Sequence, residues 1–163
     1  MDVSERVISH LEALGADFTV VSIDPAFADT AAFCERYGYT AEVSANAIVV
    51  ASRRPPVRHA VCVLLATTRL DVNHAVRSHM AVQKLSFADA DATRALTGME
   101  IGGVTPFGLA DEIPVLVDAA VMEVERCVVG GGSRSLKIEV DPSVFKRMSA
   151  VTVVDGLARG VGS

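Results

Sequence analysis

The first forty residues show apolar patterns typical of both helices and strands. Apolar residues recur every three or four positions over residues 3–14, which predicts an amphipathic helix. Residues 18–23 are apolar and rich in β-branched side chains, as in a strand. A second helix is predicted over residues 30–37, because Gly38 follows it in the position that commonly ends a helix.

The middle of the chain predicts a hairpin followed by helices and a short strand. Residues 46–52 and 60–66 are apolar strands, and the loop RRPPVR between them contains two prolines, which donate no ladder hydrogen bond. Asp71 is placed to cap a helix over residues 72–80. A strand at residues 84–87 and a helix ending at Gly98 follow.

The last third predicts strands and one more helix. In order, we expect a strand at residues 114–118, a hairpin of residues 126–129 and 136–140, a helix over residues 142–148, a strand at residues 151–154 and a frayed tail from Gly156 onward. Within the second hairpin, Lys137 and Glu139 alternate with apolar residues, which predicts a solvent-exposed face.

These elements indicate a single domain spanning residues 1–163 in the mixed α/β (α+β) class. The two hairpins argue against a purely parallel sheet. We therefore expect a central mixed, mostly antiparallel, partly barrel-like sheet with helices packed outside. The length suits one domain, and half of the 163 residues are apolar, which is enough for a sizeable core.

Composition favours a cytoplasmic protein without a membrane span. The longest apolar runs are strand-length, far below the ~20 residues that cross a bilayer. The first ten residues lack the apolar stretch of a secretory signal. Cys34, Cys62 and Cys127 are widely spaced, so we interpret them as reduced, buried thiols. The net charge of −5 gives no overall basic surface for nucleic acid, although arginines gather in the loop at residues 53–58.

Several common catalytic motifs are missing from the sequence. There is no GxSxG elbow, and the glycine cluster at residues 130–132 lacks the spacing of a phosphate loop. His74 and His79 are five positions apart, so on a helix they do not share a face suited to a metal. We therefore predict neither a metal nor a cofactor.

The segment GGVTPFG at residues 102–108 is the best candidate for a functional loop. Its glycines allow a tight turn or a close approach of bare amides to a ligand, and Pro106 stiffens the turn. Consecutive amides in such a turn bind an anion or a developing oxyanion. The alternative is a structural turn that leads into the strand at residues 114–118.

Three segments resemble the YbaK/ProX family, the aminoacyl-tRNA deacylases related to the editing domain of bacterial prolyl-tRNA synthetases. They are residues 98–108, 114–118 and 129–134, within a similarity that covers roughly residues 28–145. The resemblance implies a trans-editing enzyme that hydrolyses the ester of a mischarged tRNA carrying a small amino acid, with tRNA-Pro as one candidate. In this family, water attacks the ester carbonyl, positioned by backbone groups and a ribose hydroxyl of the tRNA.

The resemblance also implies which residues form the site. It assigns catalytic roles to Asn46, Gly102 and Thr105. It assigns substrate binding to Thr30, Gly102, Gly103, Val104, Thr105, Pro106, Asp118, Gly130, Gly131 and Gly132.

One position departs from the family pattern. Family members of known activity usually carry a lysine where this chain has Asn46, at the start of the predicted strand. Asparagine keeps the capacity to hydrogen bond but loses the charge, and charge-assisted bonds are roughly twice as strong as neutral ones. Lys137 and Arg134, near the second glycine cluster, are candidates to replace that charge.

Three functions therefore stay open at this stage. The first is a deacylase acting on the acceptor end of aminoacyl-tRNA. The second is a catalytically weak or inactive binding module for such ends or for an aminoacyl-tRNA synthetase. The third is an esterase for small aminoacyl compounds. The sequence leaves the amino acid, a synthetase partner and a homodimer undecided.

Overall fold

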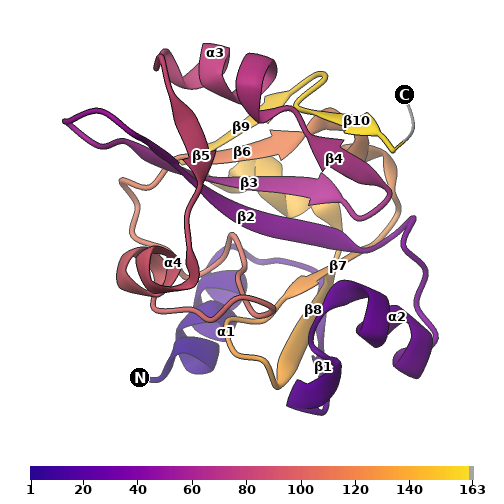
Figure 1. Cartoon of the computed structure of the whole chain (residues 1–163). Coiled ribbons are helices and arrows are strands. Elements are labelled where there is room, and N and C mark those ends of the chain that lie inside the picture. Colours follow the sequence, from indigo (N-terminus) through magenta and orange to yellow (C-terminus); the bar gives the residue numbers. More distant parts are fainter. Residues whose placement is uncertain (162–163) are drawn as a thin grey trace.

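A five-stranded mixed sheet forms the upper layer of the molecule (Figure 1). In the computed structural model, which describes residues 1–161, its order is β5 (Leu85–Phe87), β2 (Ala45–Ser52), β3 (His59–Leu65), β6 (Val115–Asp118) and β9 (Val151–Val154). The β5–β2 and β2–β3 pairs are antiparallel, whereas β6 runs parallel to both β3 and β9.

Two smaller antiparallel sheets complete the β-structure. One has the order β1 (Phe18–Ser22), β8 (Leu136–Val140), β7 (Cys127–Gly130) and lies below the large sheet (Figure 1). An isolated bridge between Ser44 and Val128 links it to the segment that leads into β2. The other pairs β4 (Thr68–Leu70) with β10 (Ala158–Gly160).

The helices lie outside the sheets and follow the local capping signals. The α-helices are α1 (Val3–Ala13), α2 (Thr30–Tyr37), α3 (Arg77–Met80) and α4 (Ala90–Thr97). Asp2 and Glu5 form a capping box that starts α1, and Gly38 and Gly98 end α2 and α4 in the left-handed conformation. In Figure 1, α3 covers the top of the large sheet, while α1 and α4 lie below it.

Four further turns of helix connect these elements. They are η1 (Pro25–Phe27), η2 (Val72–Val76), which leads directly into α3, η3 (Ala119–Glu123) and η4 (Pro142–Arg147). None of the helices within residues 1–161 has the length and apolar character needed to cross a membrane.

The large sheet is buried on both faces, which explains its long apolar strands. In β3, Val61 and Val63 point into the main core against α1 and the three-stranded sheet. Cys62 and Leu64, on the opposite face, pack in a second core beneath η2 and α3. Because neighbouring strand residues point to opposite faces, a sheet covered on both sides requires an almost continuous apolar run.

The mixed α/β class and the mainly antiparallel sheet are confirmed. Within residues 1–161, five of the seven strand pairings are antiparallel, and the sheets do not close into a barrel. Two local expectations were wrong in type: η4 is a 3-10 helix, and the predicted helix after Asp71 begins as a π-helical turn.

The expectation of a frayed tail was wrong for residues 156–160, and its last two residues, 162 and 163, lie outside the described part of the chain. Residues Ala158–Gly160 form β10, and Leu157, immediately before it, is fully buried in the second core. The Leu157 carbonyl also accepts the Asp71 N–H at 2.9 Å. The sequence hides this strand because it is short and polar, and its partner β4 is about ninety residues away in the chain.

Replacing Leu157 should therefore destabilise the protein. Leu157→Ala removes a side chain with no exposed surface and should lower the free energy of unfolding by about 2–5 kcal/mol. Val153→Ala, at a 42% exposed position in β9, is the matched control and should change it by about 0.5 kcal/mol or less. Urea denaturation measures both, and equal losses would contradict the assignment of the tail to the core.

Candidate functional site

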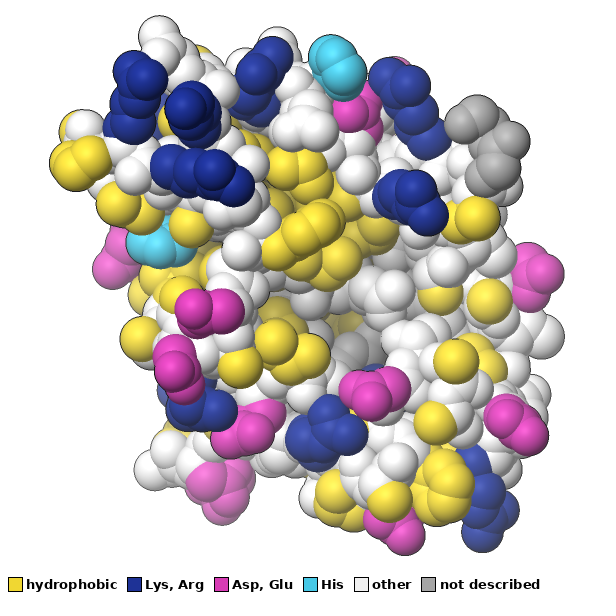
Figure 2. Space-filling view, viewed as in Figure 1, with side chains coloured by type: hydrophobic (Ala, Val, Ile, Leu, Met, Phe, Trp, Pro, Cys, Tyr) yellow, Lys and Arg dark blue, Asp and Glu magenta, His cyan; other side chains and the backbone are white. Residues whose placement is uncertain are grey.

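A cavity of about 210 Å³ opens between the large sheet and the loop at residues 102–108, called the glycine–proline loop below. Figure 2 shows the hollow in the centre of one face, with hydrophobic side chains on its walls. Its lining comes from four parts of the chain that are distant in sequence: Asp29, Thr30, Ala45, Asn46, Ala47, Ile48, Ile101, Gly102, Val104, Gly130 and Lys137. Pockets for drug-sized ligands usually occupy ~300–1,000 Å³, so this cavity fits a small group.

One wall of the cavity is an open edge of β2. The strand β5 pairs with β2 only at Val50–Ser52, and the isolated bridge to Val128 ends at Ser44. Between these points no strand within residues 1–161 covers the outer edge of β2. An uncovered edge leaves backbone N–H and C=O groups to bind a ligand.

Strand geometry identifies the free backbone groups as those of Ala47. The Ala88 N–H donates to Val49 O on the outer edge, whereas the Ser52 N–H donates to Arg58 O on the β3 side. Residues two positions apart direct their backbone groups to the same edge. The N–H and C=O of Ala47 therefore face the outer edge, where Ala47 lines the cavity.

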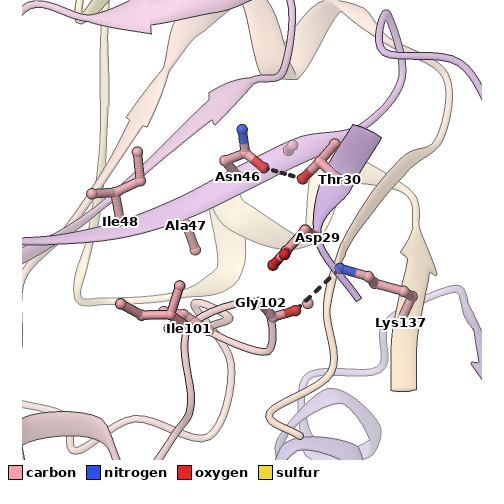
Figure 3. Close-up of a pocket in the computed structure, with 11 residues that line it drawn as sticks. Asp29, Thr30, Asn46, Ala47, Ile48, Ile101, Gly102 and Lys137 are labelled. Carbon is pink, nitrogen blue, oxygen red and sulfur yellow. Dashed lines mark hydrogen bonds between the residues drawn. The ribbon is translucent and has the colours of Figure 1, made fainter. Parts of the chain in front are cut away.

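Thr30 and Asn46 form a pair across the cavity mouth. The Thr30 hydroxyl, at the start of α2, donates to Asn46 Oδ1 at 2.5 Å (Figure 3). This bond fixes the amide plane, so Asn46 Nδ2 points away from Thr30 with its two N–H groups available to donate. Asn46 is thus an oriented donor without a charge.

Lys137 is the buried cation of the cavity. Its side chain is 6% exposed, and Nζ donates to Ala28 O at 2.7 Å and to Gly102 O at 3.2 Å (Figure 3). The ammonium group also lies 5.3 Å from the centre of the Phe33 ring. Burial lowers the pKa of Lys137, while the nearby Asp29 carboxylate acts in the opposite direction.

The predicted exposed face at Lys137 was therefore wrong. The alternation in β8 is real, but α2 covers that face of the small sheet with Phe33, so Lys137 is buried. Strand register places Lys137 opposite Gly130, which brings its side chain to the cavity. Helix–sheet packing of this kind leaves no mark on the alternating pattern itself.

The two glycine segments touch each other through their backbones. The Gly132 N–H donates to Gly103 O at 2.7 Å. A Cβ on Gly130 would lie 2.3 Å from Val104 O, and one on Gly103 would lie 2.7 Å from the Ser133 carbonyl carbon. Real Cβ atoms do not approach that closely, so both segments require glycine to pack together.

Arg134 holds the start of the glycine–proline loop through hydrogen bonds. Its Nη1 donates to Ile101 O at 2.6 Å and lies 3.3 Å from Asp29 Oδ1, and its Nη2 donates to Pro25 O at 3.1 Å. Gly102, which follows Ile101, has φ +95°. Arg134 and Lys137 therefore hold the loop from two sides through its carbonyl oxygens.

The structure brings five of the expected site residues together at the cavity and places the others elsewhere. Those at the cavity are Thr30, Asn46, Gly102, Val104 and Gly130. Gly103, Gly131 and Gly132 pack against neighbouring backbone and α1, and Pro106 lines a separate cavity beside His10.

Thr105 and Asp118 are buried away from the cavity lining. Thr105 has no exposed surface, and its hydroxyl has no hydrogen-bond partner in the described chain. Asp118 Oδ1 accepts the Ala158 N–H at 3.2 Å and so helps to hold β10. Sequence spacing placed Asp118 at a strand end but contained no sign of this bond.

Five lining residues were not assigned to the site from the sequence: Asp29, Ala45, Ala47, Ile48 and Ile101. Lys137 was named there only as a candidate replacement for the family lysine. Asp29 and Ile101 each adjoin an expected residue, so sequence proximity was the available signal. Ala47 acts through its backbone, which side-chain reasoning does not detect.

The described residues hold no metal-binding cluster, and two of the three thiols are deeply buried. Burial raises the pKa of both Cys62 and Cys127 to about 12, so neither is a thiolate near neutral pH. Among residues 1–161, no three His, Cys, Asp or Glu side chains gather closely enough to hold a metal ion. The functional groups of the cavity are therefore amides, the Thr30 hydroxyl, the Asp29 carboxylate and the amino group of Lys137.

Comparison with known proteins identifies the family. Residues 24–148 match the model of the aminoacyl-tRNA editing domain. The chain belongs to this family. The matched range includes every residue that lines the cavity.

Solved structures support the fold of this editing domain. A hypothetical protein designated APE2540 superposes with a TM-score of 0.83 at 20% identity, covering 94% of this chain and 99% of that chain. A proposed trans-editing enzyme for prolyl-tRNA synthetase gives 0.80 at 20% identity, covering 98% and 99%. A candidate signal transduction protein from Marinobacter aquaeolei gives 0.60 at 17% identity, covering 93% of this chain and 30% of that one.

The burial of Lys137 should appear in the pH dependence of stability. Because the folded lysine has the lower pKa, the unfolded state binds more protons between the two pKa values, and stability rises with pH there. The free energy of unfolding of wild type minus that of Lys137→Met should therefore increase with pH as the unfolded pKa of about 10.4 is approached. Urea titrations from about pH 7 to about pH 10.5 measure this difference. If the difference in free energy of unfolding stays constant or falls with pH, Lys137 does not have a lowered pKa in the folded protein.

Proposed function

We propose that this editing domain is a deacylase that hydrolyses the ester bond of mischarged aminoacyl-tRNA. The observation that carries the proposal is the cavity, in which an oriented amide, an open strand edge and a buried cation surround a space for a small group. Family membership supplies the substrate class, and the likeness to a proposed prolyl-tRNA synthetase trans-editing enzyme makes tRNA-Pro a candidate carrier.

In this reaction water adds to the ester carbonyl carbon, and the bond from that carbon to the ribose oxygen then breaks. The products are the free amino acid and the tRNA with its ribose hydroxyl restored. Charge develops on the carbonyl oxygen in the transition state. Asn46 Nδ2 and the Ala47 N–H are donors at the cavity wall that would stabilise this oxygen.

Lys137 supplies a positive potential but acts mainly as a positioning residue. Two of its three N–H donors bind the carbonyls of Ala28 and Gly102. It thereby holds the loop against α2 and keeps the cavity open. A buried cation also favours a developing negative charge more strongly than an exposed one, because the local dielectric constant is lower.

The cavity favours a small amino-acid side chain. Ile48 and Ile101 lie on the same side of the cavity, away from the Thr30–Asn46 pair (Figure 3). With about 210 Å³ available, an aminoacyl group the size of alanine or proline fits with room to spare. Discrimination between neighbours in size should be modest, since one methylene contributes only about 1–3 kcal/mol.

A deacylation panel tests the function directly. Purified protein is incubated with tRNAs charged with alanine, serine, cysteine, proline or phenylalanine, and amino-acid release is followed over time. We expect multiple turnover on at least one small aminoacyl-tRNA, with faster release than from phenylalanyl-tRNA. Failure to release any amino acid above the uncatalysed rate would refute the proposal.

Substitutions at Thr30 and Asn46 should distinguish the effect of the Asn46 donor from the effect of the Thr30 bond that orients it. Asn46→Ala removes a donor to the developing oxyanion and should lower kcat/KM by about 100-fold. Thr30→Val removes only the bond that orients the amide, worth about 1 kcal/mol, and should lower it by about fivefold. Asn73→Ala, at an exposed position on η2, is the matched control and should match wild type.

A second candidate is a binding module that no longer turns over substrate. It is favoured by the uncharged Asn46, where related active proteins usually have lysine, and by the use of two Lys137 donors within the fold. Saturable binding of charged tRNA with no turnover would support this candidate. A gain of turnover in Asn46→Lys would then show that the missing charge was the cause.

A further inference from the structure

We propose that a cluster of five cations at the tip of the β2–β3 hairpin binds the phosphate backbone of the RNA whose aminoacylated end enters the cavity. The hairpin cluster consists of Arg53, Arg54, Arg58, Arg77 and Lys84, all of them exposed. This inference rests on the proposed function, because it takes the substrate to be an aminoacyl-tRNA. Figure 2 shows Lys and Arg side chains gathered at the upper left, above the central hollow and on the same face.

Three chain segments meet to build the hairpin cluster. Arg54 Nη1 donates to Gln83 Oε1 at 2.9 Å, and Arg77 Nη1 donates to Gln83 O at 3.3 Å. Arg58 Nη1 donates to Met80 O at 2.9 Å. These bonds go to neutral oxygen atoms, so they position the guanidinium groups without neutralising them.

The charge of the hairpin cluster is uncompensated. Residues 52–59 and 77–84 contain no Asp or Glu, and no ion pair joins a cluster member to a carboxylate within residues 1–161. Arginines elsewhere, such as Arg94, Arg126 and Arg159, do have carboxylate partners. The whole chain carries −5, so the remainder outside these five cations carries −10. Such segregation of charge is typical of a surface that binds a polyanion.

The hairpin cluster and the cavity lie at opposite ends of the same strand. Asn46 lines the cavity, and Arg53 follows the last residue of β2, seven positions later. At ~3.3 Å per residue this separation is roughly 23 Å. A stacked nucleic-acid strand rises ~3.4 Å per nucleotide, so the hairpin cluster would meet phosphates about seven nucleotides from the esterified end.

An exposed aromatic ring lies along this path. Phe87, in β5, is 56% exposed and pairs with Val50, between Asn46 and Arg53 along β2. Aromatic rings on a basic path serve as stacking platforms for bases, worth about 1–3 kcal/mol each. An exposed ring between the cavity and the phosphate-binding cations favours RNA as the partner. A lipid surface would contact the cations but would use neither the ring nor the cavity.

Binding of an uncharged tRNA transcript tests the hairpin cluster independently of catalysis. We compare wild type with the triple variant Arg53→Gln/Arg54→Gln/Lys84→Gln by fluorescence anisotropy over a series of salt concentrations. Each lost phosphate contact should reduce the slope of log K against log salt by about one, so the triple variant should lose about three. Lys146→Gln, an exposed lysine outside the hairpin cluster, is the control and should keep the wild-type slope.

Catalytic measurements separate this inference from the proposed function. With charged tRNA the triple variant should show a KM at least tenfold higher than wild type, and with an aminoacyl ester of adenosine, which has no phosphates, it should match wild type. If the triple variant is active and its KM and salt slope equal those of wild type, the hairpin cluster does not bind RNA. The proposal of deacylase activity would be unaffected by that result.

Two further outcomes are decisive. In one outcome, the wild-type protein hydrolyses no charged tRNA but binds uncharged tRNA, and the triple variant shows the expected loss of slope. This outcome would refute the proposed deacylase activity and support RNA binding by the hairpin cluster. Binding to vesicles containing phosphatidylserine, with no measurable binding to tRNA, would overturn the RNA assignment in favour of a membrane surface.

Discussion

The contact between two bare backbones is the constraint on which the site depends. Gly103 and Gly130 lie so close to the opposite segment that any side chain would overlap with main-chain atoms. The bond from the Gly132 N–H to Gly103 O closes this contact. It fixes the loop over the small sheet, and the cavity is the space left between that loop and the open edge of β2. The glycines are thus needed mainly for architecture, and only some of them face the cavity.

Local patterns in the sequence account for most of the fold, because helices and core strands are determined by neighbouring residues. The sequence alone predicted α1 from its apolar periodicity, several helix ends from their capping residues and β3 from its apolar run. Elements that depend on distant partners could not be predicted in this way. The strand β10 forms only because it pairs with β4 and because Leu157 packs in the second core. A polar three-residue segment contains no record of such a partner.

The same distinction separates the visible parts of the site from the hidden ones. Thr30, Asn46 and Gly102 were found through their positions in recognisable segments, and they do meet at the cavity. Lys137 followed the alternation expected of a wet strand face, and only the packing of α2 over β8 buries it. The Ala47 amide was invisible for another reason: it depends on which edge of β2 is covered, and β5 covers only the last three residues.

Asn46 leaves the β2 wall of the cavity uncharged, so the positive charge there comes from Lys137 on β8. A lysine at position 46 would extend from the open edge with its donors unbound. Lys137 instead projects from β8 beneath α2 and binds two backbone carbonyls. Its ammonium group is therefore held in place and cannot follow the substrate. In the proposed deacylation, a fixed charge of this kind favours one position of the developing oxyanion, so precise docking of the acceptor end would matter more than in a site with a mobile lysine. A second contact far along the RNA, at the hairpin cluster, would provide that docking without adding any group to the cavity.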